Sequence, residues 1–185
     1  MALKLNLIVA ASENWGIGKN GTLPWKLKKE MAFFRTMTSA TEDKSKKNVV
    51  IMGRRTWESI PAQFKPLPNR INFVLSRSGL NLDQYSNTQS FTSFREALDK
   101  LEESTFRQLY ENVWIIGGSS LYNETFRSPH FHRLYLTKIH KEFDCDTFLP
   151  ALPGNLKEIS DPAVTEDIQE ENDIEYTFQV FEVTN

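Results

Sequence analysis

Hydrophobic and polar positions along the chain form two kinds of pattern. Short apolar runs rich in Val, Ile, Leu and Phe are typical of β-strands, and they lie at Leu3–Ala11, Asn48–Met52, Ile71–Leu75, Val113–Ile116 and Leu134–His140. Longer stretches with helical periodicity lie at Leu27–Met37, in a short segment from Arg54, at Phe94–Glu103 and at Ser119–Phe126. Strands that alternate with helices predict an α/β fold, in which helices cover both faces of a mostly parallel central sheet.

The C-terminal segment follows another pattern. Within Glu175–Val183, apolar residues alternate with polar ones. This alternation favours an antiparallel strand with one exposed face, so we expect such a strand at the edge of the sheet. We expect Lys44–Lys47 and Pro150–Gly154 to be surface loops. No repeat or long linker interrupts the chain, and we therefore expect a single domain over residues 1–185.

Composition narrows the class of protein. The chain has 185 residues, of which 39% are hydrophobic, and one cysteine, Cys145. A single cysteine forms neither an internal disulfide nor a cysteine-rich zinc site, so we exclude the disulfide-rich secreted classes and expect a reducing, cytosolic setting. The N-terminal apolar stretch is interrupted by Lys4 and Asn6 and reads as a strand, not as a secretory leader. Apolar runs also fall short of the roughly 20 residues that span a bilayer, so we expect no membrane role.

The net charge of −2 conceals an uneven distribution. Residues 26–77 carry 12 basic and 4 acidic side chains, a net charge of +8, whereas residues 141–185 carry 2 and 12, a net charge of −10. A basic window of this kind is either a solvated positive face or a binding site for an anion. Lys44–Lys47 suit the solvated interpretation. A nucleic-acid-binding protein is an alternative of a different class, but no recognised nucleic-acid module accompanies the window.

Three predicted strands end in residues that suit phosphate binding. The residues that follow them are Gly53-Arg54-Arg55-Thr56, Ser76-Arg77-Ser78 and Gly117-Gly118-Ser119-Ser120. Small residues at a helix N-terminus let backbone N–H groups approach an anion, and arginine adds a fork of donors. In a parallel sheet these three ends share one edge, so together they favour a dinucleotide site. Each of them alone is equally consistent with ordinary helix capping.

The segment Gly16–Gly21 has the G-x-G-x-x-G spacing of dinucleotide-binding folds. In those folds the glycines turn directly from a strand into a helix, whereas here Ser12–Trp15 follow the strand and Pro24 would break a helix interior. We therefore interpret the segment as a mobile, glycine-hinged loop beside a site.

Glu30 falls on the apolar stripe of the first predicted helix. It lies three residues after Leu27 and four before Phe34, a spacing that places all three on one helical face. Burial without a cation raises the pKa of a carboxyl group above its ordinary value of about 4.3, which makes Glu30 a candidate proton donor or ligand anchor. In the alternative interpretation Glu30 faces solvent and pairs with Lys26 or Lys29.

Six segments carry a combined signature over nearly the whole chain. They are Ile8–Ala10, Trp15–Trp25, Val50–Pro61, Leu75–Arg77, Trp114–Tyr122 and Asp146–Phe148. In order and spacing they resemble dihydrofolate reductase, and Glu30 is similar to the carboxylate of monofunctional eukaryotic members, where bacterial members usually have Asp. The resemblance implies NADPH-dependent reduction of 7,8-dihydrofolate to 5,6,7,8-tetrahydrofolate, by hydride transfer to C6 and protonation at N5, in one-carbon metabolism. A related pterin or pyrimidine reductase is the alternative among enzymes.

The resemblance implies an NADPH site at the three strand ends. The residues that it assigns to the 2′-phosphate and the pyrophosphate are Arg54, Ser76, Arg77, Arg55, Thr56, Gly117, Gly118, Ser119 and Ser120. Ala10, Ile17 and Gly21 would line the nicotinamide and its loop. The other cofactor-binding residues that the resemblance implies are Gly53, Leu75 and Tyr122. Thr92 stands where vertebrate members carry a further arginine, which leaves the strength of the preference for NADPH over NADH open.

For the substrate, the resemblance implies two polar anchors and an apolar slot. Glu30 would hydrogen-bond the pterin with Thr137 behind it, and Arg70 would clamp the α-carboxylate of the glutamate tail. The apolar residues implied are Ile8, Val9, Met31, Phe34, Ile60, Phe64, Leu67, Ile116 and Tyr122. Met31 and Phe64 stand where vertebrate members often have Phe and Asn, which affects inhibitor preference and not the reaction.

Trp25 and Leu23 complete the catalytic set that the resemblance implies, beside Glu30 and Thr137. Trp25 would help to position an ordered water, and the Gly16–Leu23 loop would close over the nicotinamide. The expected ligands are folate-like molecules and antifolates such as methotrexate. We expect no metal, no membrane and no nucleic acid among the partners, and a monomer in the cytoplasm.

Overall fold

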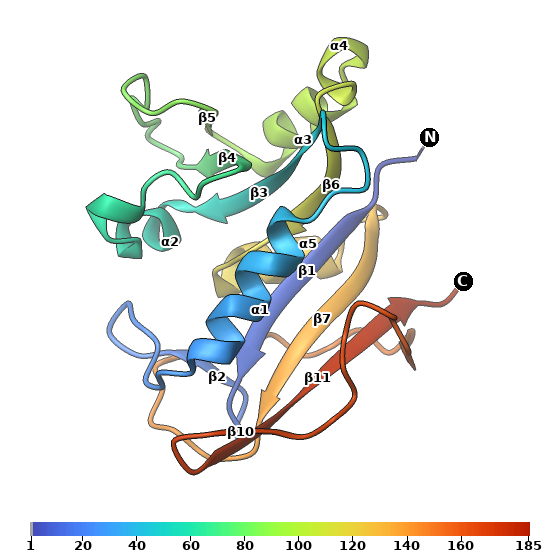
Figure 1. The fold of residues 1–185 in the computed structure, drawn as a ribbon. Helices are drawn as coiled ribbons and strands as arrows, with labels where there is room; N and C mark the ends of the chain where they lie inside the picture. Colours follow the sequence, from blue (N-terminus) through green and yellow to red (C-terminus); the bar gives the residue numbers. More distant parts are fainter. Residues whose placement is uncertain (1) are drawn as a thin grey trace.

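Parallel strands form the centre of a nine-stranded sheet in the computed structural model, which describes residues 2–185 (Figure 1). The strand order is β10-β11-β7-β1-β6-β3-β4-β5, and β9 also pairs with β11. The six mutually parallel strands are β1 (Leu5–Ala11), β3 (Lys47–Gly53), β4 (Arg70–Leu75), β5 (Thr88–Phe91), β6 (Tyr110–Ile115) and β7 (Phe131–Ile139). The five strands predicted before the C-terminal segment are confirmed, with ends displaced by a few residues. Lys47 lies in β3 and not in the predicted surface loop.

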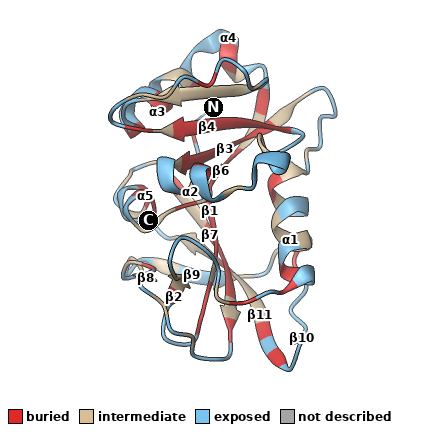
Figure 2. Ribbon diagram, turned by 90° about the vertical axis from the view of Figure 1, so that its left-hand side faces the viewer, coloured by how far each residue is buried: buried red, intermediate tan, exposed pale blue. Residues whose placement is uncertain are grey.

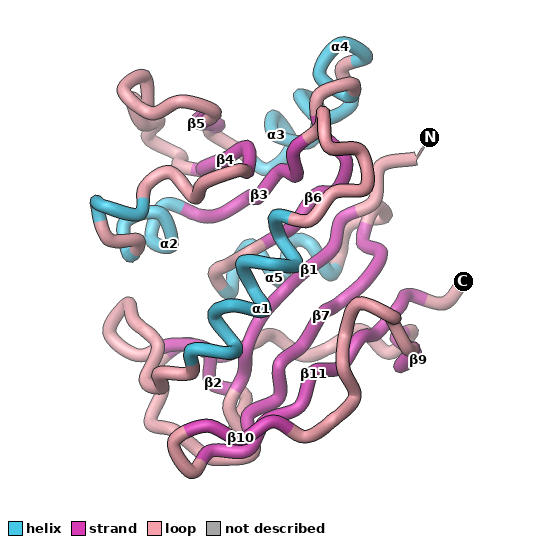
Figure 3. The backbone as a smooth tube through the Cα atoms, viewed as in Figure 1, coloured by secondary structure: helices cyan, strands magenta, loops and turns pink. Residues whose placement is uncertain are grey.

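The C-terminal strand β11 (Ile174–Val183) is antiparallel to β7, as predicted. Its predicted position at the sheet edge is wrong, because β10 (Gln169–Glu171) and β9 (Leu156–Ile159) pair with it on the side away from β7 (Figure 3). Both strands are short and largely polar, so neither has the apolar run that predicts a strand.

Four predicted helices are present. They are α1 (Lys28–Ser39), α2 (Arg54–Ser59), α3 (Phe94–Glu102) and α5 (Ser119–Phe126). A one-turn helix α4 (Ser104–Arg107) and a 3-10 turn η1 (Ala62–Phe64) are additional. Helix α1 lies on one face of the sheet, and α3 and α5 lie on the other (Figure 1).

Successive residues of the central strands pack into different layers. In β3, Val49 and Ile51 belong to the apolar cluster that includes residues of α3 and α5, whereas Val50 and Met52 pack on the side of α1. Side chains of a strand alternate between faces, so an uninterrupted apolar run is what a sheet covered on both faces requires. The central strands are accordingly buried while the outer helix surfaces are exposed (Figure 2). The predicted fold class is confirmed.

The glycine-rich segment after β1 does not begin a helix. Gly16–Gly18 forms strand β2, which pairs antiparallel with β8 (Thr147–Phe148) in a separate two-stranded sheet. The rejection of the dinucleotide-binding fingerprint is confirmed, but the expectation of a loop is wrong for these three residues. A Cβ atom on Gly16 would overlap the Sγ atom of Cys145, so glycine permits this pairing. The turn that follows joins Lys19 to Thr22 by paired backbone hydrogen bonds of 2.8 and 3.0 Å.

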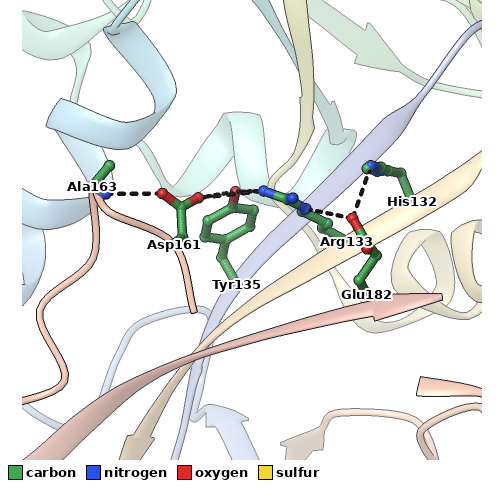
Figure 4. A network of polar contacts seen from close by, with 6 residues as sticks. All are labelled: His132, Arg133, Tyr135, Asp161, Ala163 and Glu182. Atoms are coloured by element: carbon green, nitrogen blue, oxygen red, sulfur yellow. Dashed lines mark hydrogen bonds and ion pairs between the residues drawn. The ribbon is translucent and has the colours of Figure 1, made fainter. Parts of the chain in front are cut away.

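A polar network ties β7 and β11 to the loop after β9 (Figure 4). Tyr135 donates a hydrogen bond of 2.7 Å to Asp161, and Nε of Arg133 donates one of 2.9 Å to Glu182. His132 lies 3.4 Å from the same Glu182 carboxylate. Burial, together with the hydrogen bond to Asp161, raises the pKa of Tyr135 to about 12, so its hydroxyl remains a donor near neutrality. The network holds β7, the strand on which Thr137 lies.

Candidate active site

The carboxyl group of Glu30 is buried in the first turn of α1. Its Oε1 atom accepts a hydrogen bond of 3.1 Å from Oγ1 of Thr137 on β7, and Glu30 as a whole is only 7% exposed. Burial raises the pKa of Glu30 to about 7, although the hydrogen bond from Thr137 partly opposes this. The buried interpretation of Glu30 is confirmed, and the surface pairing with Lys26 or Lys29 is wrong. Near neutrality this group therefore both gains and loses a proton.

Apolar packing on either side of Glu30 explains its position. Leu27, directly before α1, is buried in a cluster with Trp25, Ile139 and Tyr176. Anchoring the chain at Leu27 turns the third helical residue, Glu30, towards the sheet. A carboxyl group in this setting has few solvent contacts, which is the physical cause of its raised pKa.

Trp25 is buried beside the same helix end. Its ring meets that of Phe143 edge to face, with centroids 5.3 Å apart, and its Nε1 atom has no hydrogen-bond partner within residues 2–185. Because buried N–H groups are nearly always paired, this donor is suited to a water or a ligand atom. Leu23, which precedes it, is half-exposed.

Apolar side chains that the sequence predicts around the substrate are partly open to solvent. Met31 on α1 is 58% exposed and Phe64 in η1 is 57% exposed. Single exposed apolar side chains are common on protein surfaces, so the exposure of these two leaves them accessible to a ligand without identifying one. The remaining predicted members are buried or half-buried; they are Ile8, Val9, Phe34, Ile60, Leu67 and Ile116.

Arg70 begins β4 and is 3% exposed. Its Nε atom donates to the backbone oxygen of Pro68 and its Nη1 atom to Oγ1 of Thr38, both at 2.9 Å. These bonds hold the guanidinium against α1 and leave Nη2 for a ligand. Burial and the neighbouring charge of Arg35 lower the pKa of Arg70 to about 10, so the group stays cationic near neutrality.

Backbone atoms of the predicted pyrophosphate site meet between β3 and β6. The N–H group of Gly53 donates a hydrogen bond of 2.8 Å to the oxygen of Gly117, and the Gly117–Gly118 peptide is cis. A Cβ atom on Gly53 would lie 3.8 Å from that oxygen. The start of α2 and the start of α5, where Ser119 and Ser120 lie, are thus adjacent, as the parallel sheet predicts.

The predicted 2′-phosphate residues also come together. Nη1 of Arg54 donates a hydrogen bond of 3.0 Å to Oγ of Ser78, and that hydroxyl lies 3.4 Å from Oγ of Ser76. Arg77 is exposed beside them. Ser78 was not among the predicted binding residues, although the Ser76-Arg77-Ser78 run contained the signal for it.

The remaining residues predicted to bind the cofactor differ in how far they are buried. Tyr122 is buried and donates a hydrogen bond of 3.0 Å to the backbone oxygen of Ile8, and burial raises the pKa of its hydroxyl. The other predicted cofactor residues are half-buried or exposed; they are Ala10, Ile17, Gly21, Arg55, Thr56, Leu75 and Gly118.

Two cavities lie away from these residues. One of about 200 Å³ is lined by residues of β9, of the loop that follows it and of β11, and one of about 300 Å³ by Trp15 and Leu149–Leu152. Neither contains a predicted substrate or cofactor residue. Over residues 2–185 we find no group of three His, Cys, Asp or Glu side chains arranged to hold a metal ion. Within the same range no helix has the length and apolar character needed to cross a membrane.

Comparisons with known proteins agree with this geometry. The family model described as dihydrofolate reductase matches residues 4–183. The dihydrofolate reductases of Aedes albopictus and Sus scrofa are 42% and 44% identical to the chain, the first over 97% of both sequences and the second over 98% of both. The solved structure of Schistosoma mansoni dihydrofolate reductase superposes with a TM-score of 0.86 at 43% identity and covers 100% of each chain.

Proposed function

Since the chain belongs to the dihydrofolate reductase family and is an oxidoreductase that reduces 7,8-dihydrofolate to 5,6,7,8-tetrahydrofolate, we propose how its own residues divide this work. Glu30 anchors the pterin and controls the proton, Arg70 binds the glutamate tail, and the ends of β3, β4 and β6 bind NADPH. The observation that carries the proposal is the buried Glu30 carboxyl group, with its pKa near 7 and its bond to Thr137.

Glu30 is suited to manage the proton that the reaction consumes. A carboxyl group whose pKa lies near the working pH is effective in proton transfer. We assign it a hydrogen bond to the pterin amino group and ring nitrogen, through which it raises the basicity of N5 without touching that atom. Thr137 holds the carboxyl group in one orientation. The unpartnered N–H group of Trp25 positions an ordered water that delivers the proton.

The residues at the strand ends fit a phosphorylated dinucleotide. The hydrogen bond between Gly53 and Gly117 brings the starts of α2 and α5 together, where the backbone N–H groups of two helix N-termini suit a pyrophosphate. Arg54 and Ser78 provide donors for a further phosphate at the end of β4. Bound NADPH would supply a hydride from its nicotinamide to C6 of the pterin. The protein contributes orientation and the exclusion of water, the latter through the Gly16–Leu23 segment that we propose closes over the nicotinamide.

Arg70 favours folate over an unconjugated pterin or a pyrimidine. A buried guanidinium with one nitrogen left for a ligand is suited to a carboxylate such as that of the glutamate tail of folate, which an unconjugated pterin lacks. A free cysteine, Cys145, supports a reducing compartment, and we propose that the protein acts as a cytoplasmic monomer.

A coupled binding and activity measurement tests the proposal. We expect the near-ultraviolet absorbance of NADPH to fall when dihydrofolate is added, and methotrexate to abolish that fall. A parallel assay replaces dihydrofolate by a pterin without the glutamate tail. Equal kcat/KM for the two substrates would contradict the assignment of Arg70, and turnover that is insensitive to methotrexate would contradict the assignment of the pterin site.

A further inference from the structure

Glu171, at the end of strand β10, contacts the beginning of helix α1. Its Oε2 atom accepts a hydrogen bond of 2.7 Å from the backbone N–H of Lys28, and its Oε1 atom accepts one of 3.0 Å from the N–H of Lys29. Both oxygens of one carboxylate are therefore bound to the first two residues of the helix. The partners lie 143 and 142 residues away in the sequence.

Helix α1 lacks a local cap. Leu27 occupies the capping position, and a leucine side chain offers no hydrogen-bond acceptor. The first four N–H groups of a helix have no partner within the helix, so they depend on a cap, on water or on another segment. Glu171 supplies that cap from the β10–β11 hairpin. The two backbone hydrogen bonds lower the pKa of Glu171, so it is a carboxylate near neutrality.

A second contact holds the hairpin to the same place. Nδ2 of Asn172 donates a hydrogen bond of 3.1 Å to the backbone oxygen of Lys26. Burial raises the pKa of the hydroxyl of Tyr176 on β11, and the negative charges of Glu171 and Glu30 nearby raise it further. The carboxylate of Glu171 and the carboxyl group of Glu30 thus both lie near the Tyr176 hydroxyl.

We propose that Glu171 is a positioning residue for the reaction: it fixes the first turn of α1, and with it the carboxyl group of Glu30 against Thr137. The inference rests on the function proposed above for Glu30. Lys28 and Lys29 are the two helical residues directly before Glu30, so a bond to their N–H groups holds the turn that carries it. Capping from a distant hairpin makes this geometry depend on the C-terminal part of the sheet.

Loss of the cap has a defined consequence. Without Glu171 the N–H groups of Lys28 and Lys29 need water, and the first turn of α1 becomes easier to open. Opening moves Glu30 away from Thr137, and small displacements of a positioned group reduce rates strongly. The residues proposed to bind the phosphates lie at the ends of β3, β4 and β6 and in α2 and α5. None of them bonds to this turn, so we expect the binding of NADPH not to depend on the cap.

The pH dependence of activity reports on the same contact. The charged or titratable groups near Glu30 are Lys28 and Lys29 on its own helix, Tyr122 from α5 and Tyr176 from β11, while Thr137 from β7 does not titrate. Removal of the negative charge of Glu171 and easier access of water both favour the ionised form of Glu30. Activity falls at high pH as Glu30 loses its proton. When the cap is lost, we expect this upper limb of the pH profile to move to lower pH.

The test uses the full chain with Glu171→Ala, Glu171→Gln and the matched control Glu170→Gln. Glu170 is exposed on the same strand and has no hydrogen bond to α1. The substitution Glu170→Gln therefore removes the same charge and leaves the cap intact. For Glu171→Ala we expect kcat/KM for dihydrofolate to fall about tenfold, the upper limb of the pH profile to move to lower pH, and the Kd for NADPH to stay unchanged. Glu171→Gln keeps one acceptor, so we expect its kcat/KM to lie between those of Glu171→Ala and wild type. For Glu170→Gln we expect the wild-type value.

Three outcomes separate this inference from the function on which it rests. A Glu171→Ala protein with a lower Tm but wild-type kcat, KM and pH profile well below that Tm would show a cap that serves stability only, and would overturn the inference. An inactive Glu30→Gln variant beside a fully active Glu171→Ala variant would overturn the inference and leave the proposed function standing. If Glu30→Gln itself keeps wild-type kinetics, the proposed function fails first. In a Glu30→Gln background we expect Glu171→Ala to have no further effect on kcat.

Discussion

Thr137 on β7 donates a hydrogen bond to Glu30 on α1, across 107 residues of sequence. In the sheet, Thr137 lies opposite Ala10 of β1 on one side and Phe178 of β11 on the other. Ala10 is one of the residues that the resemblance assigns to the nicotinamide. The residue that bonds the proposed pterin anchor is therefore paired in the sheet with a residue proposed to line the nicotinamide, and hydride transfer between the two rings requires such proximity.

Replacement of Glu30 by Gln tests its role in proton transfer. The pKa of Glu30 near 7 predicts that wild-type kcat/KM falls as the pH rises through about 7, where the free enzyme loses the proton that the reaction needs. In Glu30→Gln we expect a loss of about a hundredfold or more at neutral pH, a smaller loss at acid pH where the substrate is already protonated, and no break near 7. Steady-state rates over the pH range measure this. An unchanged profile would refute the role.

Glu30→Gln is expected to reduce activity but to increase stability at neutral pH. Glu30 titrates near 4.5 in an unfolded chain and near 7 in the native protein, so the native state binds more protons between these values. Stability therefore falls as the pH rises through this window, by about 3 kcal/mol for a shift of this size. Between about pH 4.5 and pH 8, we expect the free energy of unfolding of Glu30→Gln to rise relative to that of wild type by roughly this amount, as measured by urea unfolding. A difference independent of pH would mean that Glu30 is not buried in solution.

Sequence patterns predicted the parts of this fold in which one physical requirement dominates. The β3 segment Val49–Met52 is buried on both faces and therefore apolar without interruption, which makes the strand predictable from the sequence. The spacing of Leu27, Glu30 and Phe34 places the carboxyl group on an apolar stripe, but it leaves burial and a surface pairing with a neighbouring lysine both open. Strands β9 and β10 escaped prediction because they are held by pairing with β11, and pairing partners leave little trace in the sequence of a short polar strand.

Contacts between distant segments were beyond the sequence. The cap of α1 by Glu171 was not predictable, because a helix is expected to carry its cap beside it and Leu27 gives no sign of a substitute. The strand pairing of Gly16 depends on a close approach to Cys145, which only the folded structure reveals. Ser78, by contrast, lay within a recognised motif, and its bond to Arg54 required only the parallel register of β3 and β4.

Arg70→Leu tests the clamp on the glutamate tail. Loss of a buried, forked cation should raise the Kd for dihydrofolate by about thirtyfold or more while the Kd for NADPH stays within about twofold of wild type. Fluorescence titration of each ligand measures both constants. Arg127→Leu removes an exposed positive charge after α5 and is the control. Because Arg70 also bonds Thr38 and Pro68, Arg70→Lys is included as a variant that keeps the charge. Equal losses for both ligands would contradict the clamp.

Arg54 and Ser78 are predicted to set the preference for NADPH over NADH. Arg54→Gln removes the cation that bonds Ser78 at the end of β4, so we expect KM for NADPH to rise about tenfold and KM for NADH to change little. Ser78→Ala, which removes one neutral donor, should have a smaller effect in the same direction. The ratio of kcat/KM for the two cofactors measures this preference. A parallel loss with both would place Arg54 away from the 2′-phosphate.

Gly117→Ala tests the glycine turn between β6 and α5. Gly117 has a φ of +117°, which L-residues with a side chain rarely adopt, and a Cβ atom there would lie 3.1 Å from the hydroxyl oxygen of Tyr122. Tyr122 is buried and bonded to Ile8, so it cannot yield freely. We expect a loss of about 1–3 kcal/mol in stability and a clearly weaker affinity for NADPH, since the same turn faces the predicted pyrophosphate. Gly154→Ala, where a Cβ atom meets nothing within 4 Å, is the matched control. Thermal unfolding with and without NADPH separates the two effects, because a variant that is destabilised but gains the wild-type Tm increment from NADPH would limit Gly117 to a structural role.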